Sequence, residues 1–257
     1  MKKLYCFAVS GCFCLMSWAT NVDSLRQYDL EEISVSATRV NVETPVAFTD
    51  VSGDEIVAKN YGQDVPYLLQ LTPSMVATSD AGAGVGYTDI RMRGYDGTRI
   101  NVTTNGVPMN DAESHKMYWV DTPDLLSSVG SMQIQRGAGT STNGSGAFGG
   151  SISMTTDNLP TSFGGSAEMS YGSFNTNKQA VRVSSGLLGG KWAVDGRLSH
   201  VYSDGYMERA FANMGSYMLQ AAYLGENTLV KLLSFGGVER TYNAWDGITK
   251  EQMEKNR

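Results

Sequence analysis

The stretch Gly144-Ser145-Gly146-Ala147-Phe148-Gly149-Gly150 (GSGAFGG) decides between two kinds of fold. Its first six residues spell G-x-G-x-x-G, which binds a dinucleotide where a strand leads into the glycines and a helix N-terminus behind them holds the pyrophosphate. Residues 131–136 upstream alternate as a strand would, but residues 151–156 downstream (SISMTT) also alternate polar and apolar side chains and predict a second strand. The sequence therefore argues against a dinucleotide site, although Glu168 lies at about the distance of the fingerprint's acidic residue.

Residues 1–19 have the pattern of a secretory signal peptide. Two lysines precede an apolar run over residues 4–18, and small residues occupy positions 17 and 19, where a signal peptidase reads them. The apolar run is shorter than the roughly 20 residues that a membrane-spanning helix needs. A lipoprotein cleavage box at residues 9–12 is disfavoured, because the apolar run continues beyond it. We therefore expect export and cleavage after residue 19.

The cysteines and the charges narrow the functional classes further. Cys6, Cys12 and Cys14 all lie inside the expected signal peptide, so the mature chain has no thiol for a disulfide, a zinc site or thiol catalysis. Without the two lysines of that segment, 18 basic residues remain against 26 acidic ones, a net charge of −8, and no basic run occurs. Nucleic acid is not expected as a partner.

Residues 21–44 are polar, have no helical stripe and are expected to form an extended tail. Within this tail, residues 32–38 (EISVSAT) alternate like a strand. Such a segment can add to the edge of a partner's sheet through backbone hydrogen bonds. A linker or an ordinary first strand explains the pattern as well, and the pattern alone favours these simpler interpretations.

The next part of the chain predicts an α+β unit. Helices are expected from Ser52 and over residues 64–71, where prolines stand near the start and just after the end. Asn105-Gly106 predicts a tight turn between two strands. Residues 123–129 predict one more short helix. Further strands are expected at residues 75–77, 89–94, 99–103 and 131–136.

After Pro160 the sequence changes to closely spaced alternating strands, in the segments 167–171, 181–184, 192–199, 216–223 and 229–235. Tight turns are expected at residues 187–190 and 225–227, a long loop at 203–214, and a longer loop from Gly236 onward. This asymmetry of short turns and long loops is typical of an outer-membrane barrel. Aromatic residues at the strand ends fit the two interfacial girdles of such a barrel: Tyr171, Trp192, Tyr202 and Tyr223.

A soluble β-sandwich would explain the alternation but neither the girdles nor the loop asymmetry. Five strands cannot close a barrel, and an open edge in hydrocarbon leaves backbone groups unsatisfied. We therefore expect the chain to be a fragment of a longer protein.

Taken in order, the motifs resemble TonB-dependent outer-membrane receptors. Residues 30–39 (LEEISVSATR) look like the TonB box, and the serial motifs of the plug domain follow at the usual spacing. Asn105 stands where Asp is more usual, and residues 139–143 replace a commoner Gly-Pro run. The plug motifs are Met92-Arg93-Gly94, Asn105-Gly106-Val107-Pro108-Met109-Asn110-Asp111, Gln135-Arg136-Gly137 and Gly146-Ala147-Phe148-Gly149-Gly150-Ser151-Ile152.

The resemblance implies an α+β plug domain at residues 45–157, followed at residues 163–257 by the first antiparallel strands of a transmembrane β-barrel of about 22 strands. The glycine-rich stretch is then a tight passage within the plug. The TonB contact falls on Glu32, Ile33, Ser34, Val35, Ser36 and Ala37. Arg93 and Arg136 resemble plug arginines that pair with barrel glutamates. Ligand contacts are expected from Tyr87, Asn110, Asp111, His115, Lys116, Tyr118 and Trp119.

The implied function is active transport of a scarce ligand, an iron complex such as a ferric siderophore or a vitamin-like compound, across the outer membrane of a Gram-negative cell. The implied partners are TonB with ExbB and ExbD, and outer-membrane lipid. No enzyme activity and no cofactor are expected. A metal site is not expected either, because a metal ion needs several ligands at suitable spacing and His115 is a single histidine in a polar loop. The alternative is a truncated, non-conducting plug that binds TonB or acts in signalling.

Overall fold

The computed structural model describes residues 39–139, 143–144, 146–157, 159–225, 227–243 and 247–255. The expected signal peptide and residues 30–38 of the expected TonB box lie outside the described residues. Among the described residues, no helix is both long enough and apolar enough to cross a membrane.

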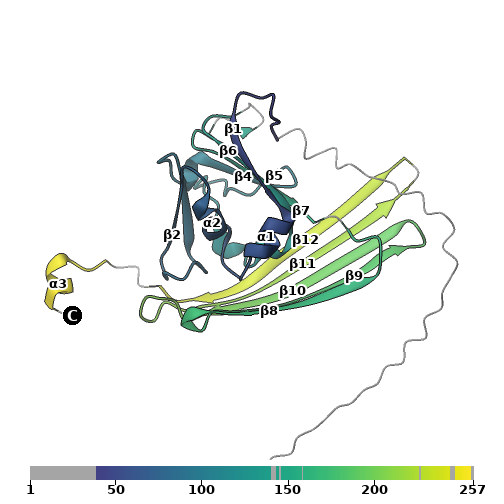
Figure 1. The fold of residues 1–257 in the computed structure, drawn as a ribbon. Helices are drawn as coiled ribbons and strands as arrows, with labels where there is room; N and C mark the ends of the chain where they lie inside the picture. Colours follow the sequence, from purple (N-terminus) through teal and green to yellow (C-terminus); the bar gives the residue numbers. More distant parts are fainter. Residues whose placement is uncertain are drawn as a thin grey trace, which may run out of the picture. The chain divides into compact units, whose positions relative to one another are not determined.

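Residues 39–157 form a mixed-sheet region around one five-stranded sheet in the order β1-β6-β7-β4-β5 (Figure 1). The pairs are antiparallel except β4 with β7, which run parallel. A separate antiparallel pair is formed by β2 and β3. The strands are β1 (Ala47–Ser52), β2 (Met75–Ser79), β3 (Thr88–Met92), β4 (Ile100–Thr104), β5 (Val107–Pro108), β6 (Val129–Arg136) and β7 (Gly150–Thr156).

Short helices connect these strands where the sequence places capping and turn residues. The Ser52 hydroxyl accepts a hydrogen bond from the Glu55 N–H at the start of α1. Asp64 precedes α2, which has a proline in its first turn, and Asn105-Gly106 turns β4 into β5 with both residues at positive φ. The helices are α1 (Gly53–Lys59), α2 (Val65–Leu68) and the 3₁₀ turns η1 (Leu69–Leu71), η2 (Gly97–Arg99), η3 (Trp119–Asp121) and η4 (Leu125–Ser128).

The glycine stretch leads directly into β7, so no helix follows it. Gly150 has φ +150° and is the first residue of β7, between Arg136 on β6 and Ile100 on β4. A Cβ at this position would overlap the Gln135 carbonyl oxygen and the Met92 sulphur. The prediction of a strand rather than a phosphate-binding helix is confirmed, and glycine is required because the backbone passes too close for a side chain.

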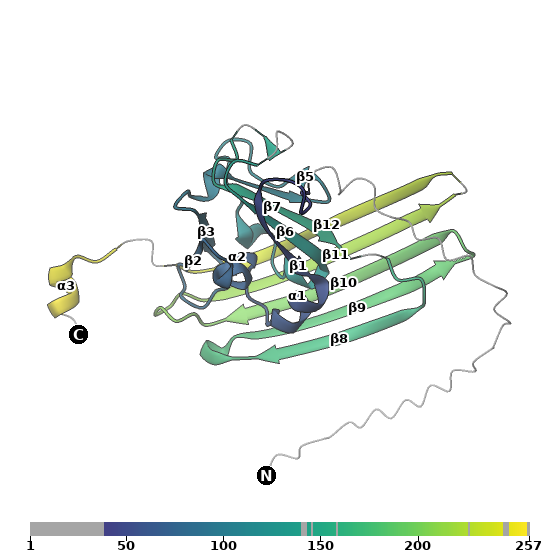
Figure 2. The same cartoon turned by 45° about the horizontal axis from the view of Figure 1, so that its top comes forward.

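Residues 159–243 form a long sheet of five antiparallel strands in sequence order, β8 to β12, seen side by side in Figures 1 and 2. The strands are β8 (Gly164–Tyr171), β9 (Asn177–Leu188), β10 (Trp192–Ser203), β11 (Ala212–Leu224) and β12 (Leu229–Thr241), with the 3₁₀ turn η6 (Ser173–Asn175) after β8 and helix α3 (Lys250–Lys255) near the C-terminus. The expected α+β fold followed by antiparallel strands is confirmed.

The two faces of the long sheet differ in polarity. One face exposes large apolar side chains, including Val181, Val183 and Leu198. The other face buries polar and charged side chains, including Lys178 and Arg197. Alternation with the apolar side outward and the polar side inward is the pattern of transmembrane barrel strands.

Aromatic residues mark both ends of the long sheet. Trp192 pairs in register with Tyr223, and their ring centroids are 4.7 Å apart. Tyr171 and Tyr202 both lie opposite Asn177 on the neighbouring strand β9, so they share the other end of the sheet. This places the four predicted girdle residues at two levels.

The prediction that a loop begins at Gly236 is wrong, because β12 continues to Thr241. A Cβ on Gly236 would lie 3.1 Å from the ring of Tyr217, which is its partner on β11. Gly237 lies opposite Ser216 and approaches Pro123 of the mixed-sheet region. The two glycines therefore make room for neighbouring side chains within a strand and do not form a turn.

Candidate functional site

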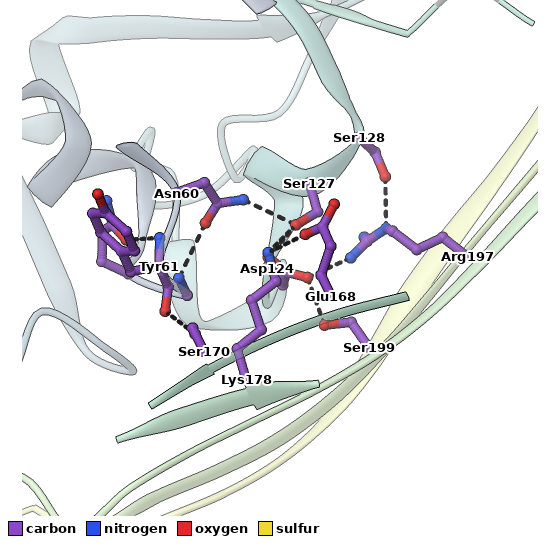
Figure 3. Close-up of polar contacts among 12 residues, drawn as sticks. Asn60, Tyr61, Asp124, Ser127, Ser128, Glu168, Ser170, Lys178, Arg197 and Ser199 are labelled. Carbon is purple, nitrogen blue, oxygen red and sulfur yellow. Dashed lines mark hydrogen bonds and ion pairs between the residues drawn. The ribbon is translucent and has the colours of Figure 1, made fainter. Parts of the chain in front are cut away.

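The polar face of the long sheet and the mixed-sheet region meet in a buried cluster of charges, drawn in Figure 3. We call this cluster the contact network. Its members are Asp124, Ser127 and Ser128 from the segment that forms η4, and Glu168, Lys178, Arg197 and Ser199 from β8, β9 and β10.

Asp124 is the centre of the contact network. Its side chain has no exposed surface, and Arg197 Nη1 lies 2.7 Å from Oδ2 while Lys178 Nζ lies 3.3 Å from Oδ1. The Ser199 hydroxyl donates to Oδ2 over 2.5 Å, and the Ser127 hydroxyl donates to Oδ1 over 2.7 Å. One carboxylate of the mixed-sheet region therefore compensates two nearly inaccessible cations of the long sheet.

The backbone at Asp124 explains how one side chain reaches so many partners. Asp124 has φ 50° and ψ 34°, a left-handed conformation that Asp tolerates better than most residues, and it immediately precedes η4. That short turn presents Ser127 and Ser128 beside the carboxylate. Ser128 Oγ accepts from Arg197 Nε over 2.7 Å, and Ser127 Oγ accepts from Lys178 Nζ over 2.5 Å.

Two further contacts continue this interface on either side. Asp157, just after β7, forms an ion pair with Arg182 on β9, whose Nε also donates to Asp195 on β10 over 2.9 Å. On the other side, the Ser170 hydroxyl donates to the Tyr61 carbonyl oxygen over 2.8 Å. Across the interface the carboxylates Asp124 and Asp157 come from the mixed-sheet region, and their cations come from the long sheet.

Apolar contacts complete the interface. One buried cluster combines Val85 and Val120 of the mixed-sheet region with Val201, Ala212 and Met214 of the long sheet, and Tyr87 packs against it. Burial raises the pKa of the Tyr87 phenol, and the nearby carboxylates Glu239, Asp121 and Asp80 raise it further. Tyr87 is thus partly a packing residue between the two sheets.

The two predicted lock arginines lie elsewhere. Arg136 donates to the Thr49 hydroxyl over 2.7 Å and to the Phe48 carbonyl oxygen over 3.1 Å, so it fastens β6 to β1. Arg93 is exposed, and its guanidinium covers Gly137. Within the described part of the chain, neither arginine forms an ion pair with β8–β12, and their pairing with barrel glutamates stays a prediction.

The predicted ligand residues after β5 fall into two groups. Asp111, His115 and Lys116 form one turn, in which the His115 N–H donates to the Asp111 carbonyl oxygen over 2.9 Å. Hydrogen bonds from the Ser114 N–H and hydroxyl lower the pKa of Asp111. Lys116 forms an ion pair with Asp89 at 2.7 Å and lies over the ring of the exposed Tyr118. These residues stay candidates for ligand contact.

Trp119 and Asn110 have structural contacts of their own, and their contact with a ligand stays a prediction. The Trp119 side chain is 3% exposed and belongs to the main apolar core. The Asn110 amide accepts from the Val102 N–H and donates to the carbonyl oxygens of Ile100 and His115. It holds the turn against β4, because these three bonds satisfy most of the amide's capacity.

Within the described ranges, no three His, Cys, Asp or Glu side chains come together as a group that could hold a metal ion. His115 stands in the exposed turn, and His200 bonds to the side chains of Gln179 and Asn213 on neighbouring strands.

The largely buried loop over residues 80–87 contacts a second buried carboxylate, Asp64. Thr88 Oγ1 donates to Asp64 Oδ2 over 2.8 Å, and the Asp64 N–H donates to the Gly84 carbonyl oxygen over 2.9 Å. Burial raises the pKa of Asp64 well above its usual value, while the bonds from Thr88 and Gly86 oppose that rise. The backbone of Asp64 therefore holds the glycine-rich loop at the start of α2, and its side chain accepts a hydrogen bond from Thr88. Burial disfavours the ionised form of this carboxyl group.

We predict that Asp64→Asn stabilises the protein more at pH 8 than at pH 5. Since the folded pKa of Asp64 is raised, its contribution to stability is fully present below the unfolded pKa of about 4 and is lost as pH rises through the folded pKa. Asparagine keeps an acceptor for Thr88 and removes the buried charge. Thermal melting of both proteins at several pH values measures the effect.

Asp96→Asn is the matched control for this pH dependence, because the pKa of Asp96 is lowered by its hydrogen bonds from Thr98. The contribution of Asp96 to stability is present above the unfolded pKa and is lost as pH falls through the folded pKa. Between pH 5 and pH 8 Asp96 is ionised in both the folded and the unfolded state, so Asp96→Asn should change the melting temperature by the same amount at both pH values. Equal melting differences at pH 5 and pH 8 for Asp64→Asn would contradict the assignment.

The contact network was not predicted from the sequence, because its members lie far apart in the chain. Asp124 and Arg197 are 73 positions apart, and neither belongs to a motif. Charged residues such as Lys178 and Arg197 at inward positions of apolar-out strands were the only available hint.

Comparison with known proteins agrees with this architecture. Residues 40–151 match the family model described as the TonB-dependent receptor plug domain. No curated protein matches the chain significantly.

Solved structures share the fold at low sequence identity. FpvA of Pseudomonas aeruginosa bound to heterologous pyoverdines is 16% identical with a TM-score of 0.63, over 77% of this chain and 26% of that one. The siderophore receptor PirA of Acinetobacter baumannii is 15% identical with a TM-score of 0.62, over 78% and 32%. The copper transporter OprC is 17% identical with a TM-score of 0.63, over 80% and 33%. The chain thus spans a third or less of these structures.

Proposed function

We propose that this chain supplies the plug and first wall strands of an outer-membrane transporter for a ferric siderophore or similar metal complex, since residues 40–151 match the family model of the TonB-dependent receptor plug domain. The observation that carries the proposal is the docking of the plug, through Asp124, onto the polar face of a long sheet whose opposite face is apolar. A plug needs polar contacts with its barrel, and a barrel wall needs an apolar surface toward lipid.

The ligand class rests on the solved structures with the same fold. FpvA was solved with pyoverdines, PirA is a siderophore receptor and OprC is a copper transporter. The exposed turn with Asp111, His115, Lys116 and Tyr118 offers charged and aromatic contacts to such a complex. The transporter makes no bond in its substrate, so the plug's task is to bind, to signal occupancy and to yield to force.

The energy source in this proposal is TonB, driven by ExbB and ExbD. TonB pairs with Glu32 to Ala37 by strand addition, in which backbone N–H and C=O groups supply the affinity. Arg93 and Arg136 are proposed to help retain the plug through glutamates of the wall. The contact network is the retaining interaction that the described strands supply themselves.

Val35→Pro tests the proposed energy coupling. Proline removes one backbone donor from the added strand and restricts the residue before it, so we expect the affinity for the TonB C-terminal domain to fall at least about tenfold. Uptake of a radiolabelled ferric siderophore by cells should fall in parallel. Val42→Pro, in the exposed turn outside the box, is the control and should leave the TonB affinity unchanged.

The outcomes separate the proposal from its alternative. Uptake that survives Val35→Pro would contradict the assigned box. TonB binding without any ligand uptake by the wild-type protein would favour the non-conducting plug that binds TonB or acts in signalling.

A further inference from the structure

The apolar face of the long sheet ends in a row of polar and aromatic residues, which we call the polar row. The row crosses all five strands, because each member is the register partner of the next. It shares a face with the exposed Val181 and Leu198, since residues two apart in a strand point the same way. From β8 to β12 its members are Tyr171, Asn177, Tyr202, Asn213 and Arg240.

The position of the polar row matches one boundary of a membrane core. From Trp192 to Tyr202, β10 rises about 33 Å at roughly 3.3 Å per residue. A strand tilt of about 35–45° reduces this to roughly 23–27 Å across the membrane, close to the apolar band of about 25 Å in outer-membrane barrels. The long connection 204–211 leaves β10 at this row, whereas the connections from β9 to β10 and from β11 to β12, at the opposite end, are short. Since the longer loops of such barrels are extracellular, the row lies at the level of the outer headgroups.

His200 lies next to the polar row and bridges three strands. Its Nδ1 is 3.1 Å from Gln179 Oε1 on β9, and its Nε2 is 2.9 Å from Asn213 Oδ1 on β11. Gln179 Nε2 donates to Asn177 Oδ1 over 2.7 Å, which turns the amide oxygen toward the imidazole. The exposed His200 ring is therefore held in one place on the outward face.

Next to His200, β11 presents a glycine instead of a side chain. Gly215 is the register partner of both His200 and Val238, and a Cβ on it would meet one atom within 4 Å, the Ser199 carbonyl oxygen at 4.0 Å. The outward surface is therefore open between the imidazole and β12. Val238 is 78% exposed and offers an apolar surface there, and Arg240 follows it two residues later at the polar row.

The charges favour an anion at the β12 end of the row. Arg240 is exposed, and the guanidinium of Arg209 from the connection 204–211 lies over the ring of Tyr242 at 5.7 Å from its centroid. At the β10 position of the row, the Tyr202 hydroxyl donates to Asp204 Oδ1 over 2.6 Å, so a carboxylate lies on that side. Attraction by the arginines and repulsion by Asp204 both direct an anionic group toward β11 and β12.

We propose that Arg240, His200 and Asn213 form a site for the phosphorylated headgroup of an outer-leaflet lipid, whose acyl chain lies along Val238. The guanidinium of Arg240 pairs with phosphate oxygens in a fork, and the imidazole and amide provide further polar contacts beside Gly215. The inference rests on the proposed function, because it requires the long sheet to be a membrane wall. It adds a second ligand on the face of that wall opposite the plug.

The experiment measures lipid binding to the complete protein, purified in mild detergent, by native mass spectrometry. The two probes are diphosphorylated lipid A and the same lipid after removal of both phosphates. Arg240→Gln removes the charge at similar side-chain length, and His200→Phe keeps a ring without nitrogen atoms. Arg91→Gln is the matched control, because Arg91 is an exposed arginine on β3 of the plug.

The wild type should bind the diphosphorylated probe at least about tenfold more tightly than the dephosphorylated probe, because hydrogen bonds between charged groups are strong. Arg240→Gln should remove most of this preference and His200→Phe should reduce it, whereas Arg91→Gln should leave it unchanged. Should His200→Phe fail to assemble without its bonds to Gln179 and Asn213, Arg240→Gln decides alone, since it changes an exposed side chain near the end of β12.

Equal affinity of the wild type for the two probes overturns the site, as does a wild-type preference in Arg240→Gln. A lower melting temperature of His200→Phe with an unchanged lipid preference overturns the assignment of His200, which then only pairs the strands. Cell fractionation distinguishes these results from a failure of the proposed function. A protein absent from the outer membrane contradicts the proposed wall, whereas a protein in the outer membrane without the lipid preference contradicts this site alone.

Discussion

Asp124→Asn is expected to lower the free energy of unfolding by about 3–5 kcal/mol, because it removes the only carboxylate that forms an ion pair with the buried Arg197 in the described part of the chain and leaves the buried Lys178 with the half-exposed Glu168 alone. Both side chains are almost inaccessible to water, at 1% and 4% exposure, so solvent cannot replace the lost carboxylate. Asparagine keeps the size of the side chain and one acceptor oxygen. The substitution therefore isolates the charge from the packing.

The loss should appear as weaker docking of the plug on the long sheet. Thermal melting of the protein in membranes, read by protease sensitivity of the plug, measures it. The effect should be large even at high salt, since buried ion pairs are screened much less than exposed ones.

Glu168→Gln is the matched control, because Glu168 also pairs with Lys178 but its side chain is 54% exposed. An exposed ion pair contributes about 0–1 kcal/mol, so this variant should melt close to the wild type. If the two substitutions cost the same, Asp124 is not the centre of the interface and the contact network does not retain the plug.

Gly150→Ala is expected to destabilise the plug by about 3–5 kcal/mol or to prevent its folding, through overpacking and backbone strain together. The added methyl would overlap the Gln135 carbonyl oxygen, which cannot move without shifting the β6 backbone, and the sulphur of the fully buried Met92 side chain. The φ of +150° adds strain for any residue with a Cβ.

Gly146→Ala lies in the same glycine stretch and provides the control. Its Cβ would meet no atom within 4 Å, and its φ is outside the left-handed region. We expect a change within about 0.5 kcal/mol, or a small gain from the less flexible unfolded chain. Chemical denaturation of the two variants compares them, and equal stability would refute the close-passage account of Gly150.

Local chemistry made much of the fold predictable. Ser52 before an acidic first turn predicted α1, and the pair Asn105-Gly106 predicted the hairpin between β4 and β5. The period-2 alternation after Pro160 predicted long antiparallel strands with an apolar and a polar face. Each of these signals depends on neighbours within a few positions, so the sequence contains it completely.

One error came from non-local packing. A loop was predicted from Gly236 onward, but β12 continues to Thr241, and the ring of Tyr217 lies beside Gly236 within the sheet. A residue on the neighbouring strand, distant in the chain, thus explains the glycine.

The sequence by itself determined the order of the elements, the close passage at the glycine stretch and the two-faced character of the wall strands. Only the tertiary structure decided that Asp124 meets Lys178 and Arg197, the latter 73 positions away. The physical reason is that backbone conformation and alternation follow from short-range sterics, whereas the pairing of buried polar groups follows from strand register and sheet packing. Register is set by the sum of many contacts along each strand, and no short stretch of sequence contains that sum.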